Sequence, residues 1–259
     1  MFDTEFDAHM NEAFKSVFEG HEDQVGSRPT INTITVAVGT NFAWKREIDT
    51  FLEYMKARGV QDIVTDKIHA SKRKKKASIG MFKNCGIVLR IAGYDCNVVA
   101  KVFFKSGLLH ITGARSMSMI KDASRKIVTV LNAAVTSVKI QMINVSYAIN
   151  KTIAMNDTFE ALKQVFTDGK VVVMYDKDHH PGIKVVAQGE KGTTFIFRSG
   201  KFILSGFVDP DGFKAHTSRL LNALWSPAAS HVLMDPEEAK AAVAEEDQDF
   251  DATLDEIFN

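Results

Sequence analysis

The sequence predicts an α+β protein made of two β-α-β-β-β-β-α repeats, which form one antiparallel sheet with four helices on one face. The segment FFKSGLLHITG, residues 103–113, is echoed 93 positions later as IFRSGKFILSG, residues 196–206. The segments on either side of both hairpins also follow the same order. Such an internal repeat indicates that the two halves share one fold. The second face of the sheet would then have no protein cover.

Each repeat begins with a β-type run that contains Ile-Asn, at 30–39 and at 141–149. Apolar residues at helical spacing then predict helices over 43–58 and 158–168, the second with Asp157 as its N-cap.

Four strands come next in each repeat, two single runs and the two strands of a hairpin, because β-branched runs alternate with turn residues. The runs are VQDIVT, GIVLRIAG and the first hairpin in one repeat, and KVVVMY, GIKVVAQG and the second hairpin in the other. A helix closes each repeat. Ser116 is expected to cap the first, and Asp209 followed by Pro210 is expected to open the second.

The formal net charge of zero is the sum of three regions with opposite net charges. Residues 1–29 carry net −5, residues 30–234 net +14 and residues 235–259 net −9. A basic body between acidic ends indicates a polyanionic partner for the body and two interaction segments at the ends.

The remaining composition excludes several classes of protein. At 259 residues the chain can hold one large or two small domains, and 45% hydrophobic residues suffice for a core. No apolar run is long enough to cross a membrane and no secretory signal is present, so we expect an intracellular protein. Cys85 and Cys96 are expected to be reduced thiols. The sequence predicts no metal site, no cofactor and no catalytic residue.

The order of these motifs resembles the TATA-box-binding protein family (TBP). The resemblance covers residues 30–225 in pattern and is sharpest at the two hairpins, at HPGI (180–183) and at VKIQ (138–141). The low identity suggests a divergent member, of the kind that large DNA viruses encode. It implies a saddle-shaped sheet with the helices on its convex face.

The resemblance also divides the chain. An acidic N-terminal extension (1–29) precedes a first repeat (30–138) with a basic insertion near 67–80. A second repeat (139–232) precedes an acidic C-terminal tail (233–259).

The resemblance implies a general transcription initiation factor that binds A/T-rich promoter DNA in the minor groove and bends it with Phe wedges; this family is itself the standard example of such binding. The implied partners are double-stranded DNA, RNA polymerase or initiation factors, in a nuclear or viral replication compartment. Phe104 and Phe197 match the second Phe of each wedge pair. His180 stands where the second repeat should have its first wedge Phe, and Phe82 is the substitute in the first repeat.

Residues on the uncovered sheet face are expected to contact the groove floor, whose A·T pairs offer acceptors that an Asn amide can bind. Asn32 and Asn144 are the expected symmetric pair, although aligning VKIQ with the family motif would put Met142 in that place. His110 stands where the family has Val. The expected face consists of Asn32, Ile34, Val102, His110, Thr112, Asn144, Ser146, Phe195, Ile203 and Ser205.

Phosphate contacts are expected from basic residues at the sheet margins and from the run SKRKKKAS, which can instead be a solvated loop or a nuclear-localisation patch. These residues are Arg90, Lys105, Arg115, Arg198, Lys201, Lys72, Arg73, Lys74, Lys75 and Lys76.

Several alternatives stay open. The acidic ends could be solubilising disorder, a peptide that docks on a polymerase or factor, or a segment that folds back on the basic face. The whole chain could be a TBP-like module of a nucleic-acid-processing enzyme, since YDKDHH (175–180) gathers acids and histidines. It could also be an interaction module whose sheet binds a peptide.

Overall fold

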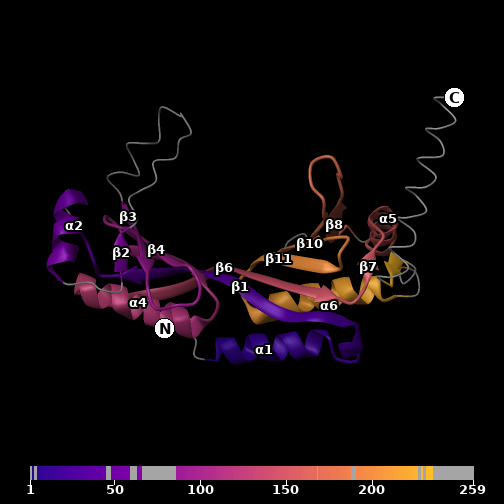
Figure 1. Ribbon diagram of the computed structural model, residues 1–259, viewed down its shortest axis with the longest axis horizontal. Helices are drawn as coiled ribbons and strands as arrows, with labels where there is room; N and C mark the ends of the chain where they lie inside the picture. Colours follow the sequence, from indigo (N-terminus) through magenta and orange to yellow (C-terminus); the bar gives the residue numbers. More distant parts are fainter. Residues whose placement is uncertain are drawn as a thin grey trace, which may run out of the picture. The chain divides into compact units, whose positions relative to one another are not determined.

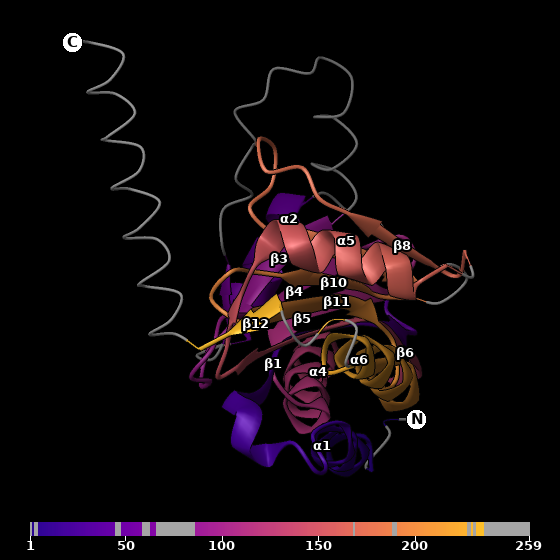
Figure 2. The same cartoon turned by 90° about the vertical axis from the view of Figure 1, so that its right-hand side faces the viewer.

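The computed structural model describes residues 2, 5–44, 48–58, 63–65, 86–167, 169–187, 191–226, 229 and 232–235. The chain divides into two compact units (Figures 1 and 2). The first holds residues 1–11 and 31–144, and the second holds residues 12–30 and 145–259.

The first unit contains antiparallel strands in the hydrogen-bonded order β2-β3-β4-β5-β1. Their bounds are β1 Val25–Thr40, β2 Ile63–Thr65, β3 Gly86–Ile91, β4 Val98–Phe103 and β5 Leu108–Ala114. Helix α2 (Ile48–Ala57) follows β1, and α4 (Met117–Leu131) follows β5 and packs on it.

The second unit repeats this plan with the order β6-β11-β10-β9-β8. Its strands are β6 Val135–Ile149, β8 Val171–Met174, β9 Ile183–Ala187, β10 Thr193–Ile196 and β11 Lys201–Phe207. Its helices are α5 Met155–Val165 and α6 Pro210–Leu224. A short 3-10 helix, η1 (Glu22–Gln24), and a two-stranded sheet of β7 (Thr152–Ile153) and β12 (Leu233–Met234) complete it.

Both sets of strands belong to one ten-stranded sheet, whose middle strands, β1 and β6, each have residues in both units. The expected α+β class and the repeated β-α-β-β-β-β-α order are therefore confirmed.

Two of the three expected helix caps are present. Ser116 Oγ accepts a hydrogen bond from the Met119 N–H at 3.1 Å, and Asp209 accepts one from the Gly212 N–H at 2.7 Å, with Pro210 at the first helical position. The expected cap at Asp157 is wrong. Helix α5 begins at Met155, because Ala154 is already fixed by its N–H bond to the carbonyl oxygen of Val232 at 3.0 Å. Asp157 lies in the first turn, where a carboxylate still favours the helix dipole.

Helix α1 (Phe6–Val17) was not predicted from the sequence. Phe6, Met10, Ala13 and Val17 recur at helical spacing and are all buried. In the first unit, the Asp7 carboxylate accepts hydrogen bonds from the N–H groups of Met117 at 2.7 Å and Ser118 at 3.2 Å. In the second unit, Phe14 meets the edge of Phe213 in α6 at 5.2 Å between ring centroids.

These contacts bear on two of the alternatives for the N-terminal extension, disorder and folding back on the basic face. Residues 6–17 are neither a disordered segment nor a cover for the uncovered sheet face. They form a helix that packs on the helical layer.

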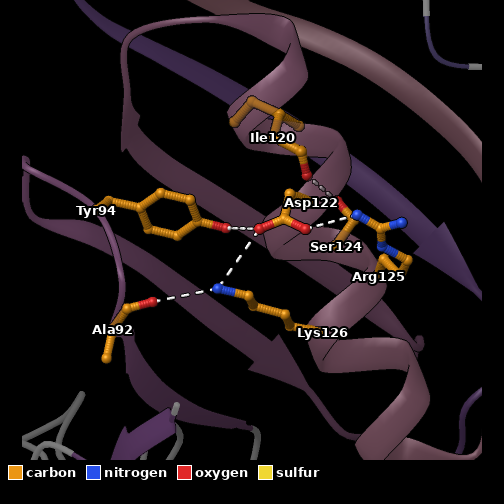
Figure 3. A network of polar contacts seen from close by, with 7 residues as sticks. All are labelled: Ala92, Tyr94, Ile120, Asp122, Ser124, Arg125 and Lys126. Carbon is orange, nitrogen blue, oxygen red and sulfur yellow. Dashed lines mark hydrogen bonds and ion pairs between the residues drawn. The ribbon is translucent and has the colours of Figure 1, made fainter.

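A polar network holds α4 to the turn between β3 and β4 in the first unit (Figure 3). Asp122 accepts hydrogen bonds from the Tyr94 hydroxyl at 2.7 Å and from Arg125 at 2.6 Å, and it forms an ion pair with Lys126 at 3.4 Å. The Tyr94 hydrogen bond, followed by the one from Arg125, lowers the pKa of Asp122 below its ordinary value. The network therefore fixes the helix against the sheet.

Candidate nucleic-acid interface

Alternate residues along each strand define two faces in both units. In β5, Leu109 and Ile111 are fully buried beneath α4, whereas His110 and Thr112 are only half-buried. In β11, Phe202 and Leu204 are buried, whereas Ile203 and Ser205 are half-buried. We call the face that carries the half-buried residues the open face. Figure 2 shows α4 and α6 each on one side of the strands of its own unit.

In the first unit the open face is basic and polar. Lys101 in β4 lies opposite His110 in β5, which in turn lies opposite Ala37 in β1. Arg90 in β3 is exposed and lies opposite Val99. Lys101 is also exposed. The sequence prediction missed Lys101, because it placed Val102 on this face instead.

The surroundings of His110 favour its neutral form. Burial lowers its pKa from the ordinary value, and the positive charge of Lys101 lowers it further. No hydrogen bond to the imidazole is formed by the residues that the structure describes. A neutral imidazole has one donor and one acceptor nitrogen. The neutral His110 ring therefore has one donor and one acceptor, and the residue lies half-buried on the open face.

In the second unit the open face carries an aromatic cluster, defined by His180, Phe195 and Phe197. The His180 ring lies 4.9 Å from the Phe195 ring and 6.0 Å from the Phe197 ring, centroid to centroid, tilted in both cases. All three side chains are only partly buried or exposed. The cluster forms because β10 places Phe195 and Phe197 on the same face and the loop before β9 lays His180 beside them.

The loop before β9 fixes the His180 ring. The Gly182 N–H donates to Nδ1 of His180 at 3.0 Å. A β-carbon at Gly182 would lie 3.1 Å from the Phe197 ring and 3.2 Å from the His180 ring, which is tighter than ordinary contact. The His-Pro-Gly sequence thus combines a side-chain acceptor with a residue that leaves room for the cluster.

Phe104 is not on the open face, so its prediction as a wedge is wrong. It is 2% exposed, and its ring packs on Phe51 of α2. The loop length explains the difference. In the first hairpin four residues, 104–107, separate the paired Phe103 and Leu108. In the second, the Phe197 N–H bonds to the Lys201 carbonyl oxygen, so only three residues intervene.

The additional residue shifts β4 by one position, and each one-residue shift exchanges the two faces of a strand. Phe103 is half-buried on the open face, where Phe104 had been expected. For the same reason Val102 is 0% exposed and lies in the core, contrary to prediction. The consecutive Phe103-Phe104 pair in the sequence is the signal that could have raised this alternative.

Ile34 is also wrongly placed by the sequence prediction. It pairs with Ala114 and is 0% exposed, because β1 turns Ile34, Val36 and Val38 towards the core. Thr35 lies on the other face and its hydroxyl is 3.1 Å from that of Thr112.

The expected symmetric Asn pair is wrong as well. The Thr40 N–H donates to the Gly107 carbonyl oxygen, and the Ile149 N–H donates to the Gly200 carbonyl oxygen, both at 3.0 Å. These equivalent bonds align Thr40 with Ile149 and therefore Asn32 with Gln141. Asn144 aligns instead with Thr35. Matching the Ile-Asn letters misaligned the two strands by three residues.

Asn144 itself lies on the open face, between the buried Ile143 and Val145. Its Oδ1 atom is buried and accepts no hydrogen bond from the described residues. Ser146, Phe195, Ile203 and Ser205 lie on the open face as expected, as do His110 and Thr112 in the first unit. Asn32 is exposed.

The structure places the basic residues expected to contact phosphate differently from one another. Lys105, Arg198 and Lys201 are exposed at the ends of the two hairpins. Arg115 instead forms an ion pair with Asp95 at 3.3 Å, at the opposite end of β5. Phe82 and the basic run at 72–76 lie outside the described residues. Lys184, opposite Phe195 on β9, is an open-face cation that the sequence prediction missed.

The acids and histidines of YDKDHH do not all gather at one place. His179 contacts the Asp176 carboxylate at 2.8 Å on the surface, whereas His180 joins the aromatic cluster. Among the residues that the structure describes, no group of three or more His, Cys, Asp or Glu side chains could hold a metal ion. Within the same residues, no helix is long and apolar enough to cross a membrane.

No protein-family model and no curated protein matches the chain. Among solved structures, it is similar to the TBP of Methanococcus jannaschii, with a TM-score of 0.54 and 18% identity, over 76% of this chain and 97% of that one. At this identity the likeness shows the fold, which is therefore TBP-like.

Two other structures match with TM-scores too low to indicate a shared fold. The heterotetrameric sarcosine oxidase of Corynebacterium sp. U-96 gives 0.29 at 9% identity, over 84% of this chain and 92% of that one. The aspartate kinase of Clostridium acetobutylicum gives 0.23 at 10% identity, over 79% and 37%.

Proposed function

We propose that this protein binds duplex DNA in the minor groove through its open face, bends it, and acts as a TBP-like transcription initiation factor without catalytic activity. The observation that carries the proposal is the aromatic cluster of His180, Phe195 and Phe197, half-exposed on the helix-free face of a TBP-like fold. Partly exposed aromatic side chains on a sheet are suited to wedge between base pairs, at a cost of a few kcal/mol per unstacked step.

The chemistry along the strands supports minor-groove contact. Ser205 and Thr112 carry short hydroxylated side chains and Ile203 is apolar, so all three can lie against a shallow groove floor. Asn144 lies partly buried on the open face, so its amide group can meet a ligand there. An NH₂ group donates to the acceptors that A·T pairs present, A N3 and T O2. This supports an A/T-rich promoter element.

The charge distribution supports the same partner. Lys105, Arg198 and Lys201 are exposed at hairpin ends, and the body of the chain carries net +14. Each phosphate contact adds about −0.9 to the slope of log affinity against log salt concentration. RNA polymerase or initiation factors are the proposed protein partners, in an intracellular compartment. The viral origin suggested by sequence divergence is part of the same proposal.

Selection from a random duplex pool, followed by a bending assay on the selected duplex, tests the proposal. We expect A/T-rich winners, strong bending, and competition by a distamycin-type ligand that occupies the minor groove. Binding that is abolished only by major-groove modification would contradict the proposal. Failure to bind any duplex would favour a peptide-binding sheet, and cleavage of DNA with Mg²⁺ would favour an enzyme.

A further inference from the structure

The two hairpins place different chemistry at the same position of the open face. In the first unit Lys101 lies opposite His110. In the second, Phe195 lies opposite Ile203. His110 and Ile203 are equivalent, since each is the third residue after the turn glycine, Gly107 or Gly200. The polar pair Lys101 and His110 of the first unit therefore takes the place of the apolar pair Phe195 and Ile203 of the second.

His110 has room and free bonding capacity for a ligand. Its neighbour on β1 is Ala37, whose side chain is a single methyl group. The imidazole is half-buried and makes no hydrogen bond to any residue that the structure describes. Burial and the charge of Lys101 lower its pKa, which favours the neutral form. One ring nitrogen can therefore accept a hydrogen bond from a ligand, and the Lys101 ammonium beside it can only donate.

The minor groove offers one feature that such a pair can use and Ile203 cannot. A·T pairs show only acceptors there, whereas a G·C pair adds the guanine N2 amino group as a donor. Pressed against Ile203, that amino group would be buried without a partner, which is costly. Against His110 it can donate to the imidazole, while Lys101 donates to an acceptor of the same pair.

We propose that the protein distinguishes the two ends of its DNA element: a G·C pair is favoured opposite His110 in the first unit and rejected opposite Ile203 in the second. The inference rests on the proposed function. It makes the element asymmetric, so the bound duplex has one preferred orientation. His110 is then a specificity-determining residue, and Ile203 is its apolar counterpart.

Modified bases test the inference directly. In the selected duplex, each G·C pair is replaced in turn by inosine·C, which lacks only the N2 amino group, and each A·T pair by 2,6-diaminopurine·T, which adds it. We expect inosine at one position to weaken binding about tenfold, the usual scale for one mismatched pair. We expect diaminopurine to weaken binding by a similar factor at the other end.

Exchanging the side chains at residues 110 and 203 shows which base-pair effect belongs to which residue. With His110→Ile, the inosine effect should disappear and diaminopurine should become unfavourable at that end. With Ile203→His, diaminopurine should become tolerated at the other end. Both side chains lie on the open face rather than in the core, and unfolding by urea checks that each variant remains folded.

The outcomes separate the two proposals. A wild-type protein that binds no duplex contradicts the proposed function. A protein that binds and bends its selected duplex, but responds equally to guanine and inosine at every position, overturns the asymmetry and leaves minor-groove binding intact. An inosine effect that survives His110→Ile would also overturn the role of His110.

Discussion

The ring of Phe104 packs on the ring of Phe51, with 4.8 Å between their centroids, and this contact places Phe104 in the core of the first unit. Its neighbour Phe103 lies half-buried on the open face. Two adjacent Phe residues thus have separable roles, one in stability and one in the proposed binding surface.

Phe104→Ala should lower the free energy of unfolding by about 3–5 kcal/mol, the usual cost of removing a buried aromatic ring. Phe103→Ala is the matched control and should cost much less stability. Urea unfolding measures the stability of both variants, and DNA titration measures whether the loss of the open-face Phe103 ring weakens binding. A Phe104→Ala protein of wild-type stability that bends DNA poorly would restore Phe104 as a wedge.

Phe197→Ala should weaken DNA binding and reduce bending, because it removes a ring from the aromatic cluster. Fluorescence energy transfer between the duplex ends measures the bend. His180→Phe should bind as well as wild type or better, since the larger apolar ring fills the same place. A large loss of affinity on that change would instead indicate that a hydrogen bond of His180 is required, either to DNA or to the Gly182 N–H.

Asp7→Ala should lower the free energy of unfolding by about 1 kcal/mol, the typical value of an N-terminal helix cap. Its carboxylate satisfies the N–H groups of Met117 and Ser118 in α4. Glu12→Ala, in the same helix but exposed, is the control and should have little effect. Equal losses from the two variants would mean that the cap contributes nothing specific.

Tyr94→Phe should destabilise the protein by about 1 kcal/mol at neutral pH, because it removes the hydrogen bond to Asp122. That bond lowers the pKa of Asp122 below its ordinary 3.8. A carboxyl whose pKa is lower in the folded than in the unfolded protein stabilises the fold at pH values above its unfolded-state pKa. This stabilisation is lost as the pH falls through the folded-state pKa. The difference between wild type and variant should therefore shrink below about pH 3.8. A difference that is constant with pH would contradict this.

Deletion of residues 236–259 should tighten DNA binding at low salt. This segment carries net −8 and is tethered to a basic body, so it competes intramolecularly for the same cations. The Debye length shortens with added salt, so the gain should diminish at physiological ionic strength. Unchanged affinity at both salt concentrations would leave the tail as a docking or solubilising segment. Lys151 keeps its ion pair with Asp235 in this truncation.

The sequence alone determined the order of elements within the two repeats, both caps at Ser116 and Asp209, and the open-face position of Phe195 and Ile203. These features depend on local chemistry: a side-chain oxygen beside free N–H groups, period-two alternation, and a repeated turn. Each can be read from a few neighbouring residues.

Only the tertiary structure decided the placement of Phe104, Val102, Ile34 and the Asn residues. The loop of the first hairpin has one residue more than that of the second, so each side chain of β4 lies on the opposite face from the one expected. This shift is visible only in the pairing of Phe103 with Leu108. The docking of α1 likewise depends on residues more than a hundred positions apart, Asp7 and Met117. Strand register and long-range packing are set by which faces can be buried together, and that is a property of the assembled layers rather than of any short segment.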